Sequence, residues 1–481
     1  MKIKRDGITY TLSPKTLTAV VSECDEKKEG KVVLPAQVEH KGKTYAVTEI
    51  REYAFCRCSK MQSIIIPDGV QSIEGAFIGC ERLMEIFIPK SVTNIVAIFG
   101  AYSIFKDDHH SILKEMYPHL TSIIVEKGNK VYDSRNNCNA IIETATNTLI
   151  AGCAKTIIPN DIQTIGEHAF DDCIDLISID IPHSVKNINE FAFYKCRNLS
   201  SVTLHNGISN IRARAFENTN LKSIYIPESI QEIQCYLFEG CPLESIVVDS
   251  NNPVYDSRDN CNAIIETATN TLIVGCANTR IPSSVTRIGI GAFIGCTTLT
   301  HIDIPASVRV IDFAAFDNCE NMVSITFHEG LHTIKCNFDG CKKLKELIFP
   351  KTLKEYYTSI FRDCNSLKTL VIPNNATLWG NVKYTFYNLP QLTYLQLTPI
   401  MLASMFGDTT YPLENEMKKD EIRIAMENDN VYLTFPKATI NKYFRLRPDC
   451  EISIGEGEKG TICFGDIFEG REETEKGEGD K

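Results

Sequence analysis

The sequence has no long apolar run, no surplus of positive charge and no signature of a common enzyme class. No segment approaches the roughly 18 consecutive apolar residues that span a bilayer, so we predict no membrane insertion. The chain carries 50 Lys and Arg against 61 Asp and Glu, a net charge of -11. This balance argues against a nucleic-acid partner, because binding to phosphate requires clustered cations.

The first residues, MKIKRDGITYTLSPKTL, are basic but lack the apolar core of a secretory signal peptide. Two locations stay open on this evidence. The chain is cytoplasmic if Met1 is the true start, or it is an exported protein in a form that lacks its export signal.

Motifs for catalysis and metal binding are also missing. The sequence contains no G-x-S-x-G, no P-loop and no H-x-x-x-H. Residues Asp107 to His110 offer four metal-ligand types in a row, but adjacent residues rarely converge on one ion, which favours a solvated loop. The segment DSRNNCN lacks the central Gly and the terminal Glu of a calcium loop. We predict no enzymatic activity, no cofactor and no metal site.

A repeat organises most of the chain. The pattern A-F-x-x-C-x-x-L-x-x-I-x-I-P-x-S-V-x-x-I recurs about every 23 residues, as at Phe170, Phe193 and Phe216. The alternation in I-x-I is typical of a strand with one buried face, and the proline ends that strand. S-V-x-x-I makes a second short apolar segment that returns along the coil, and A-F-x-x-C predicts a tight helical or 3-10 turn. One such coil cannot bury its own apolar side, so we predict a repeat solenoid, mainly β, in which stacked coils share one core.

Nineteen cysteines invite a disulfide or zinc interpretation, but there is no CxxC…CxxC pair. We predict instead a structural ladder of reduced thiols that pack as small apolar side chains. Side chains one coil apart are spaced by about 4.8 Å, slightly beyond the separation of Cβ atoms in a disulfide. The predicted ladder consists of Cys58, Cys80, Cys173, Cys196, Cys241, Cys296, Cys319, Cys341 and Cys364.

One passage occurs twice. Residues 132–153 and 255–276 differ only at Asn136 versus Asp259 and at Ala151 versus Val274. Within each copy, NAIIETATNTLI predicts two short strands around a polar turn. The passage therefore predicts two hairpin-variant coils, at about 126–156 and 249–280, as part of a duplicated block of coils.

The repeat and the VYDSRDNCNAIIETATNTLIVGC variant closely resemble the BspA-type leucine-rich-repeat family, from about Gly7 to Leu397. The opening residues resemble the amino-terminal cap of that family. The resemblance implies a leucine-rich-repeat array and a non-enzymatic binding protein of the cell surface or the secreted fraction. Several members are linked to adhesion to extracellular-matrix proteins and host cells.

These observations predict four regions. Residues 1–50 form an amino-terminal β cap, and residues 51–398 form the solenoid, with an insertion at about 100–119. Residues 399–468 form a carboxy-terminal cap or small β region, and residues 469–481 form a disordered, charged tail.

Exposed strand positions line up across the coils of a solenoid and predict a binding face. The alternative is that these residues only favour strands or pack beneath a flank. The candidate contact residues are Phe87, Asp180, Tyr225, His301, Asp303 and Tyr394. By the resemblance, the partner of this monomer is an extracellular-matrix or host surface protein. An intracellular scaffold, favoured by the missing signal and the many thiols, and glycan recognition, suggested by a Ser-rich stripe, stay as alternatives.

Overall fold

The computed structural model describes residues 1–96, 98–99, 119–336, 338–357, 361–373, 376–379, 389, 391–397, 423–427, 430–434, 451–454 and 461–463. They belong to two units, Met1–Cys241 and Pro242–Lys481, each of which is considered by itself. The Asp107–His110 segment, nearly all of the 100–119 insertion and the 469–481 tail lie outside the described residues, so those predictions stay untested.

The amino-terminal residues form the sheet that starts the stack. The strands are β1 (Lys2–Arg5), β2 (Ile8–Ser13), β3 (Thr18–Cys24), β5 (Gln37–His40) and β6 (Lys43–Ile50). β1, β2 and β3 form an antiparallel meander, and β3 then pairs with β6 in parallel. Alternate residues of β2 face the core, so that Ile8, Tyr10 and Leu12 are buried. β4 (Glu29–Val33) joins a different sheet, where it pairs in parallel with the first repeat strand.

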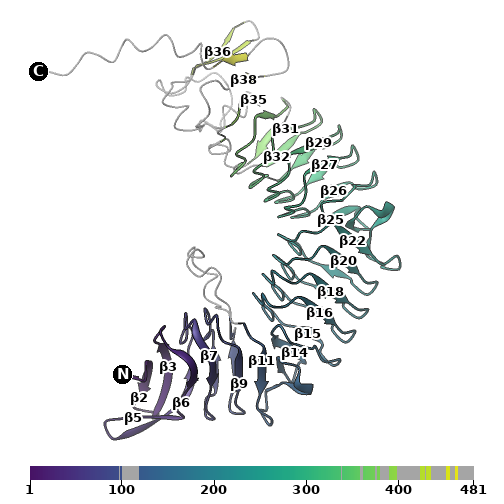
Figure 1. Cartoon of the computed structure of the whole chain (residues 1–481). Coiled ribbons are helices and arrows are strands. Elements are labelled where there is room, and N and C mark those ends of the chain that lie inside the picture. The colour runs from purple at the N-terminus through teal and green to yellow at the C-terminus, as the bar shows by residue number, and fades with distance from the viewer. Residues whose placement is uncertain are drawn as a thin grey trace, which may run out of the picture. The chain divides into compact units, whose positions relative to one another are not determined.

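An ordinary coil of the first unit contributes two strands. Figure 1 shows these coils stacked side by side. The I-x-I segments form β7 (Lys60–Ile65), β9 (Glu85–Ile88), β11 (Ser122–Val125), β16 (Ser178–Ile181), β18 (Ser201–Leu204) and β20 (Ser223–Ile226). The S-V-x-x-I segments form β8 (Ser72–Glu74), β10 (Asn94–Val96), β15 (Thr164–Ile165), β17 (Asn187–Ile188), β19 (Asn210–Ile211) and β21 (Glu232–Ile233). Equivalent residues pair in parallel, as Ile64 does with Ile86, which builds the apolar ladders of the core.

The second unit repeats this arrangement. Its I-x-I strands are β22 (Ser245–Val248), β27 (His301–Ile304), β29 (Ser324–Phe327), β31 (Glu346–Ile348), β33 (Thr369–Val371) and β35 (Tyr394–Leu397). Its second strands are β26 (Arg287–Ile288), β28 (Val310–Ile311), β30 (Thr333–Ile334), β32 (Glu355–Tyr357) and β34 (Thr377–Trp379). β35 pairs with β38 (Glu451–Ile454), β38 pairs with β39 (Thr461–Cys463), and β36 (Arg423–Glu427) pairs with β37 (Asn430–Thr434).

The A-F-x-x-C segments are hydrogen-bonded turns that stack on one another. The Phe193 N–H donates to the carbonyl of Ala215 in the next coil at 2.8 Å. The Phe193 ring lies 4.9 Å from that of Phe170 and 5.2 Å from that of Phe216, in parallel stacks. Positive φ angles two residues before and after this phenylalanine, at Phe191 and Lys195, bend the chain around the ring. The two 3-10 helices among the described residues lie elsewhere, at η2 (Arg135–Asn137) and η3 (Arg258–Asn260).

The duplicated passage forms the two predicted hairpin variants. The first contains β12 (Tyr132–Asp133), β13 (Ile141–Glu143) and β14 (Thr148–Ala151). The second contains β23 (Tyr255–Asp256), β24 (Ala263–Glu266) and β25 (Thr271–Gly275). Both are antiparallel, and β14 and β25 then pair in parallel with β15 and β26 of the following coil. The passage therefore inserts an antiparallel hairpin into a parallel stack, which is an architectural role.

Candidate protein-binding face

The exposed side of the I-x-I strands is built by strict alternation. In β9, Ile86 and Ile88 point into the core, whereas Glu85 and Phe87 face solvent. Because equivalent residues of neighbouring coils are paired, each exposed position extends into a row across the coils. The strands are held by backbone hydrogen bonds to both neighbours, so the rows are presented on a rigid scaffold.

The first coils present an apolar row. Phe87 is paired with Ile65 on one side and with Ile124 on the other, and Ile65 is paired with Val33. The four side chains are between 37% and 59% exposed. Val33 was missed by the sequence pattern because β4 precedes the first A-F turn. The V-V-L-P at residues 32–35 resembles I-x-I-P and could have indicated it.

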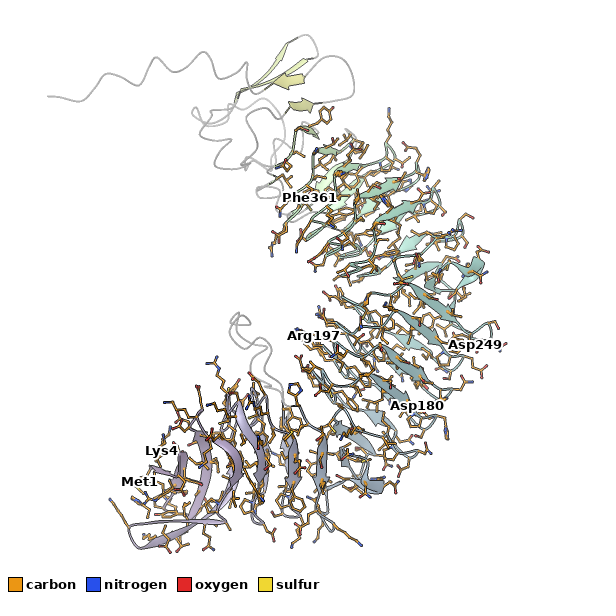
Figure 2. The ribbon with its side chains drawn as sticks, viewed as in Figure 1. Met1, Lys4, Asp180, Arg197, Asp249 and Phe361 are labelled. Atoms are coloured by element: carbon orange, nitrogen blue, oxygen red, sulfur yellow. The ribbon has the colours of Figure 1, made fainter. Side chains whose placement is uncertain are left out.

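Asp180 belongs to an exposed Asp–His pair that occurs twice. Its Oδ1 lies 2.7 Å from Nε2 of His205, and Oδ1 of Asp303 lies 2.8 Å from Nε2 of His328. The side chains are 73% and 48% exposed in the first pair and 69% and 52% in the second. Figure 2 shows Asp180 and Arg197 on opposite sides of the coils of the first unit.

The two histidines are further members of this face that sequence reasoning missed. His205 and His328 occupy the position after the strand where the repeat pattern has proline. The signal was present, since both Asp–His spacings equal 25 residues in the two duplicated blocks.

The other candidate residues lie on the same set of strands but do not gather at one point. Tyr225, on β20, is 49% exposed. The Nδ1 of His301 lies 2.7 Å from the hydroxyl of Ser324 on the neighbouring strand β29. Tyr394 is half-buried and is paired with Thr369 of β33. The candidates thus mark an extended face in each unit.

The predicted cysteine ladder lies in the A-F-x-x-C turns, outside the I-x-I strands that carry this face. All seventeen cysteines that the structure describes are free thiols, and of the nine ladder members all but Cys173 are buried. The Sγ atoms of Cys80, Cys196 and Cys319 donate to the carbonyls of Phe55, Phe170 and Phe293 at 3.1, 2.9 and 3.1 Å. Burial raises the pKa of Cys296 to about 11 and that of Cys364 to about 12. Where such a bond forms, a protonated thiol joins its coil to the preceding one.

A polar hollow lies beside the second hairpin variant. It is lined by residues of η3 and of the loop after β25, including Asp259, Asn260, Asn262, Asn278 and Arg280. The first variant has Asn136 in place of Asp259, Lys155 in place of Asn278 and Ile157 in place of Arg280. The duplicated passage thus carries different surface chemistry in its two copies. Within the described part of the chain, no group of three or more His, Cys, Asp or Glu side chains is placed to hold a metal ion.

Residues 43–106, 150–262 and 274–398 match the family model of the BspA type leucine rich repeat region, in six copies. This chain belongs to the BspA-type leucine-rich-repeat family. The match covers more than half of the chain and confirms both the resemblance and the predicted solenoid. The repeat fold of this family generally serves protein interaction rather than catalysis.

Several solved structures are similar to the BspA-type chain. A leucine rich cell surface protein from Faecalibacterium prausnitzii A2-165 is 22% identical, with 82% of this chain and 93% of that chain covered and a TM-score of 0.45. A leucine-rich repeat protein from Bacteroides ovatus is 20% identical, with 85% and 98% covered and a TM-score of 0.37. The pneumococcal vaccine antigen PcpA is 18% identical, with 84% and 95% covered and a TM-score of 0.42.

A search of curated proteins finds no match to this chain. In the described ranges of the BspA-type chain, no helix is long and apolar enough to cross a membrane.

Proposed function

We propose that this chain is a non-enzymatic solenoid that binds a protein through the exposed face of its I-x-I strands. The observation that supports this most directly is the in-register row Val33, Ile65, Phe87 and Ile124, which exposes four apolar side chains on a rigid sheet. Exposed apolar groups in a contiguous row are characteristic of surfaces that become buried against a partner.

The proposed partner is an extracellular-matrix or host surface protein, bound by a monomeric chain at the cell surface or after secretion. Membership of the BspA-type family supports this version. The rival version is an intracellular scaffold, which the many free thiols favour. Surface-protease shaving of intact cells followed by fractionation separates the two. Release of the chain by the protease supports adhesion, whereas full protection supports the scaffold.

The binding face is tested with the purified full chain on immobilised extracellular-matrix proteins. The test variant is Phe87→Ser combined with Ile124→Ser. The control is Ile157→Ser, which removes an apolar side chain that is 76% exposed and lies outside the face. We expect the double variant to weaken binding by about ten-fold or more and the control to change it by less than about two-fold. Equal loss in both variants would contradict the proposed face.

Glycan recognition is the second candidate function, and the polar hollow beside η3 favours it. Carboxylate, amide and guanidinium groups line this hollow, and such groups hydrogen-bond sugar hydroxyls. The test is binding to an array of neutral oligosaccharides. Asp259→Asn with Arg280→Ile gives two positions of the second copy the residues of the first. A glycan site would be supported if this double variant no longer bound an oligosaccharide that the wild type binds. The control variant Lys155→Ala should still bind it.

A further inference from the structure

Two thiols meet where the amino-terminal cap joins the first coil. Cys24 is the last residue of β3, and Cys58 ends the first turn after β6. Their Sγ atoms lie 3.7 and 3.6 Å from the same acceptor, the carbonyl oxygen of Asp25. Each of the two thiols also affects the pKa of the other. Cys24 is 7% exposed and Cys58 is fully buried, so the pair sits at the edge of the core.

This arrangement differs from that of the other ladder cysteines. Cys80 and Cys341 donate to the carbonyls of Phe55 and Phe316 in the preceding coils, at 3.1 and 3.2 Å. Parallel pairing keeps successive ladder thiols about one strand spacing apart, which is slightly beyond the usual separation of Cβ atoms in a disulfide. Cys58 is the first member of the ladder and contacts the cap instead of a preceding A-F turn. Cys24 belongs to that cap, so the register of the coils does not hold it away from Cys58.

The reactivity of the pair is also distinct. The neighbouring Cys58 thiol and then the Lys28 ammonium lower the pKa of the Cys24 thiol, against the opposing effect of burial, whereas Cys24 and burial raise the pKa of Cys58. At the described cysteines where the pKa shifts, Cys24 is the one that shifts downward, and burial raises the pKa of Cys56 and Cys80. Since the thiolate is the nucleophile in disulfide exchange, Cys24 is the attacking group.

We propose that Cys24 and Cys58 form a disulfide under oxidising conditions and thereby tie the amino-terminal cap covalently to the first coil. The oxidant is a low-molecular-weight disulfide such as oxidised glutathione. The Cys24 thiolate attacks one sulfur of that molecule and expels one glutathione thiolate, which takes up a proton. Cys58 then loses its proton to solvent and attacks Sγ of Cys24 in the mixed disulfide, which expels the second glutathione.

The net reaction breaks two S–H bonds, forms one Sγ–Sγ bond and reduces one glutathione disulfide to two thiols. Its structural consequence concerns the end of the stack. Terminal capping elements protect the open coil of a solenoid, so a covalent link there keeps the cap from detaching. The pair is thus an exception to the expectation of reduced thiols throughout the chain.

The test uses the reduced full chain, incubated with oxidised glutathione, then alkylated and digested with trypsin without reduction. Cleavage after Arg57 places Cys56 and Cys58 on different peptides, so mass spectrometry distinguishes them. We expect one dominant linked species, the peptide with Cys24 joined to the peptide with Cys58, and a higher melting temperature. Free thiols at both positions, or linkage of either peptide mainly to Cys56 or Cys80, would overturn the proposal.

Three variants complete this experiment. Cys24→Ser and Cys58→Ser are expected to remove the linked species and the rise in melting temperature. Cys80→Ser, at the next ladder position, is expected to keep both. Cys58 is fully buried, so Cys58→Ser could fail to fold. In that case the peptide map of the wild type decides the proposal by itself. Retention of the rise in melting temperature in Cys24→Ser counts against the pair.

Discussion

The imidazole of His205 lies 2.7 Å from the carboxylate of Asp180, and His328 and Asp303 repeat this pair at 2.8 Å in the second duplicated block. The two blocks therefore share a surface feature as well as a hairpin. Each histidine occupies the position of a strand-ending proline, so its side chain reaches back over the strand of the preceding coil. The pair orients a carboxylate on the face that we propose for binding.

His205→Ala tests whether this pair serves stability. Both side chains are largely exposed, and exposed ion pairs contribute at most about 1 kcal/mol. We expect the free energy of unfolding from urea titration to fall by less than about 1 kcal/mol. The matched variant His328→Ala should behave alike in the second unit. A loss well above that size would show that the pair is a structural clasp.

Glu217 makes stability depend on pH. Burial and the neighbouring Glu239 carboxylate raise the pKa of Glu217 to about 7, against the opposing Arg214 guanidinium. The folded state therefore binds the proton more tightly than the unfolded state. This contribution is fully favourable below about pH 4.5 and is lost as the pH rises toward 7.

Glu217→Gln removes that titration. Between pH 4.5 and 7.5 we expect the stability of the variant relative to the wild type to rise by about 2–3 kcal/mol. Denaturant titrations at a series of pH values measure this difference. The control Glu190→Gln replaces an exposed carboxylate of the same block and should leave the pH profile unchanged. If the stability of Glu217→Gln and that of the wild type changed with pH in the same way, Glu217 would not be the group responsible.

Gly275 permits the second hairpin to pack against the following coil. A Cβ atom at this position would overlap with the ring of the buried Phe293. We expect Gly275→Ala to cost about 1–3 kcal/mol, because a close-packed core tolerates added volume poorly. Gly30→Ala is the control, since its φ of +69° strains alanine but no atom lies within 4 Å. The steric explanation fails if Gly30→Ala is the more destabilising of the two.

Arg135 forms a hydrogen-bond network at the first hairpin variant. Its guanidinium donates to both carboxylate oxygens of Asp133 at 2.8 and 2.6 Å, and to Asn147 and Asp161 at 2.9 and 2.6 Å. Burial alone would raise the pKa of Asp133, but these contacts hold it below its usual value. Arg135→Ala should cost about 1–3 kcal/mol in thermal or urea unfolding. The control Lys155→Ala, in the same hairpin of the wild-type chain, should lower the free energy of unfolding by less than about 0.5 kcal/mol.

The pH dependence of this network has a defined sign. Because the folded pKa of Asp133 is lowered, its contribution is present above the unfolded pKa and is lost as the pH falls through the folded pKa. Wild type and Arg135→Ala should therefore converge in stability in acid. Divergence below pH 4 would show that the network acts through packing rather than charge.

The repeating apolar pattern by itself determined the coil, its I-x-I strand and the burial of Phe193 and Cys196, because each of these depends on residues a few positions apart. The hairpin variants could be predicted for the same reason, since NAIIETATNTLI contains both strands and their turn. The face was predictable as a set of alternating positions, including Phe87 and Asp180.

Only the tertiary structure decided which side chains meet across coils. The register of the stacked coils brings together residues that are 25 to 32 positions apart, as it does for His205 and Asp180, Cys80 and the Phe55 carbonyl, and Val33 and Ile65. The pattern within one coil does not specify which residue of the next coil a side chain meets, because that depends on how the coils stack. The approach of Cys24 to Cys58 depends further on how the cap docks on the first coil, since the two residues belong to different structural patterns.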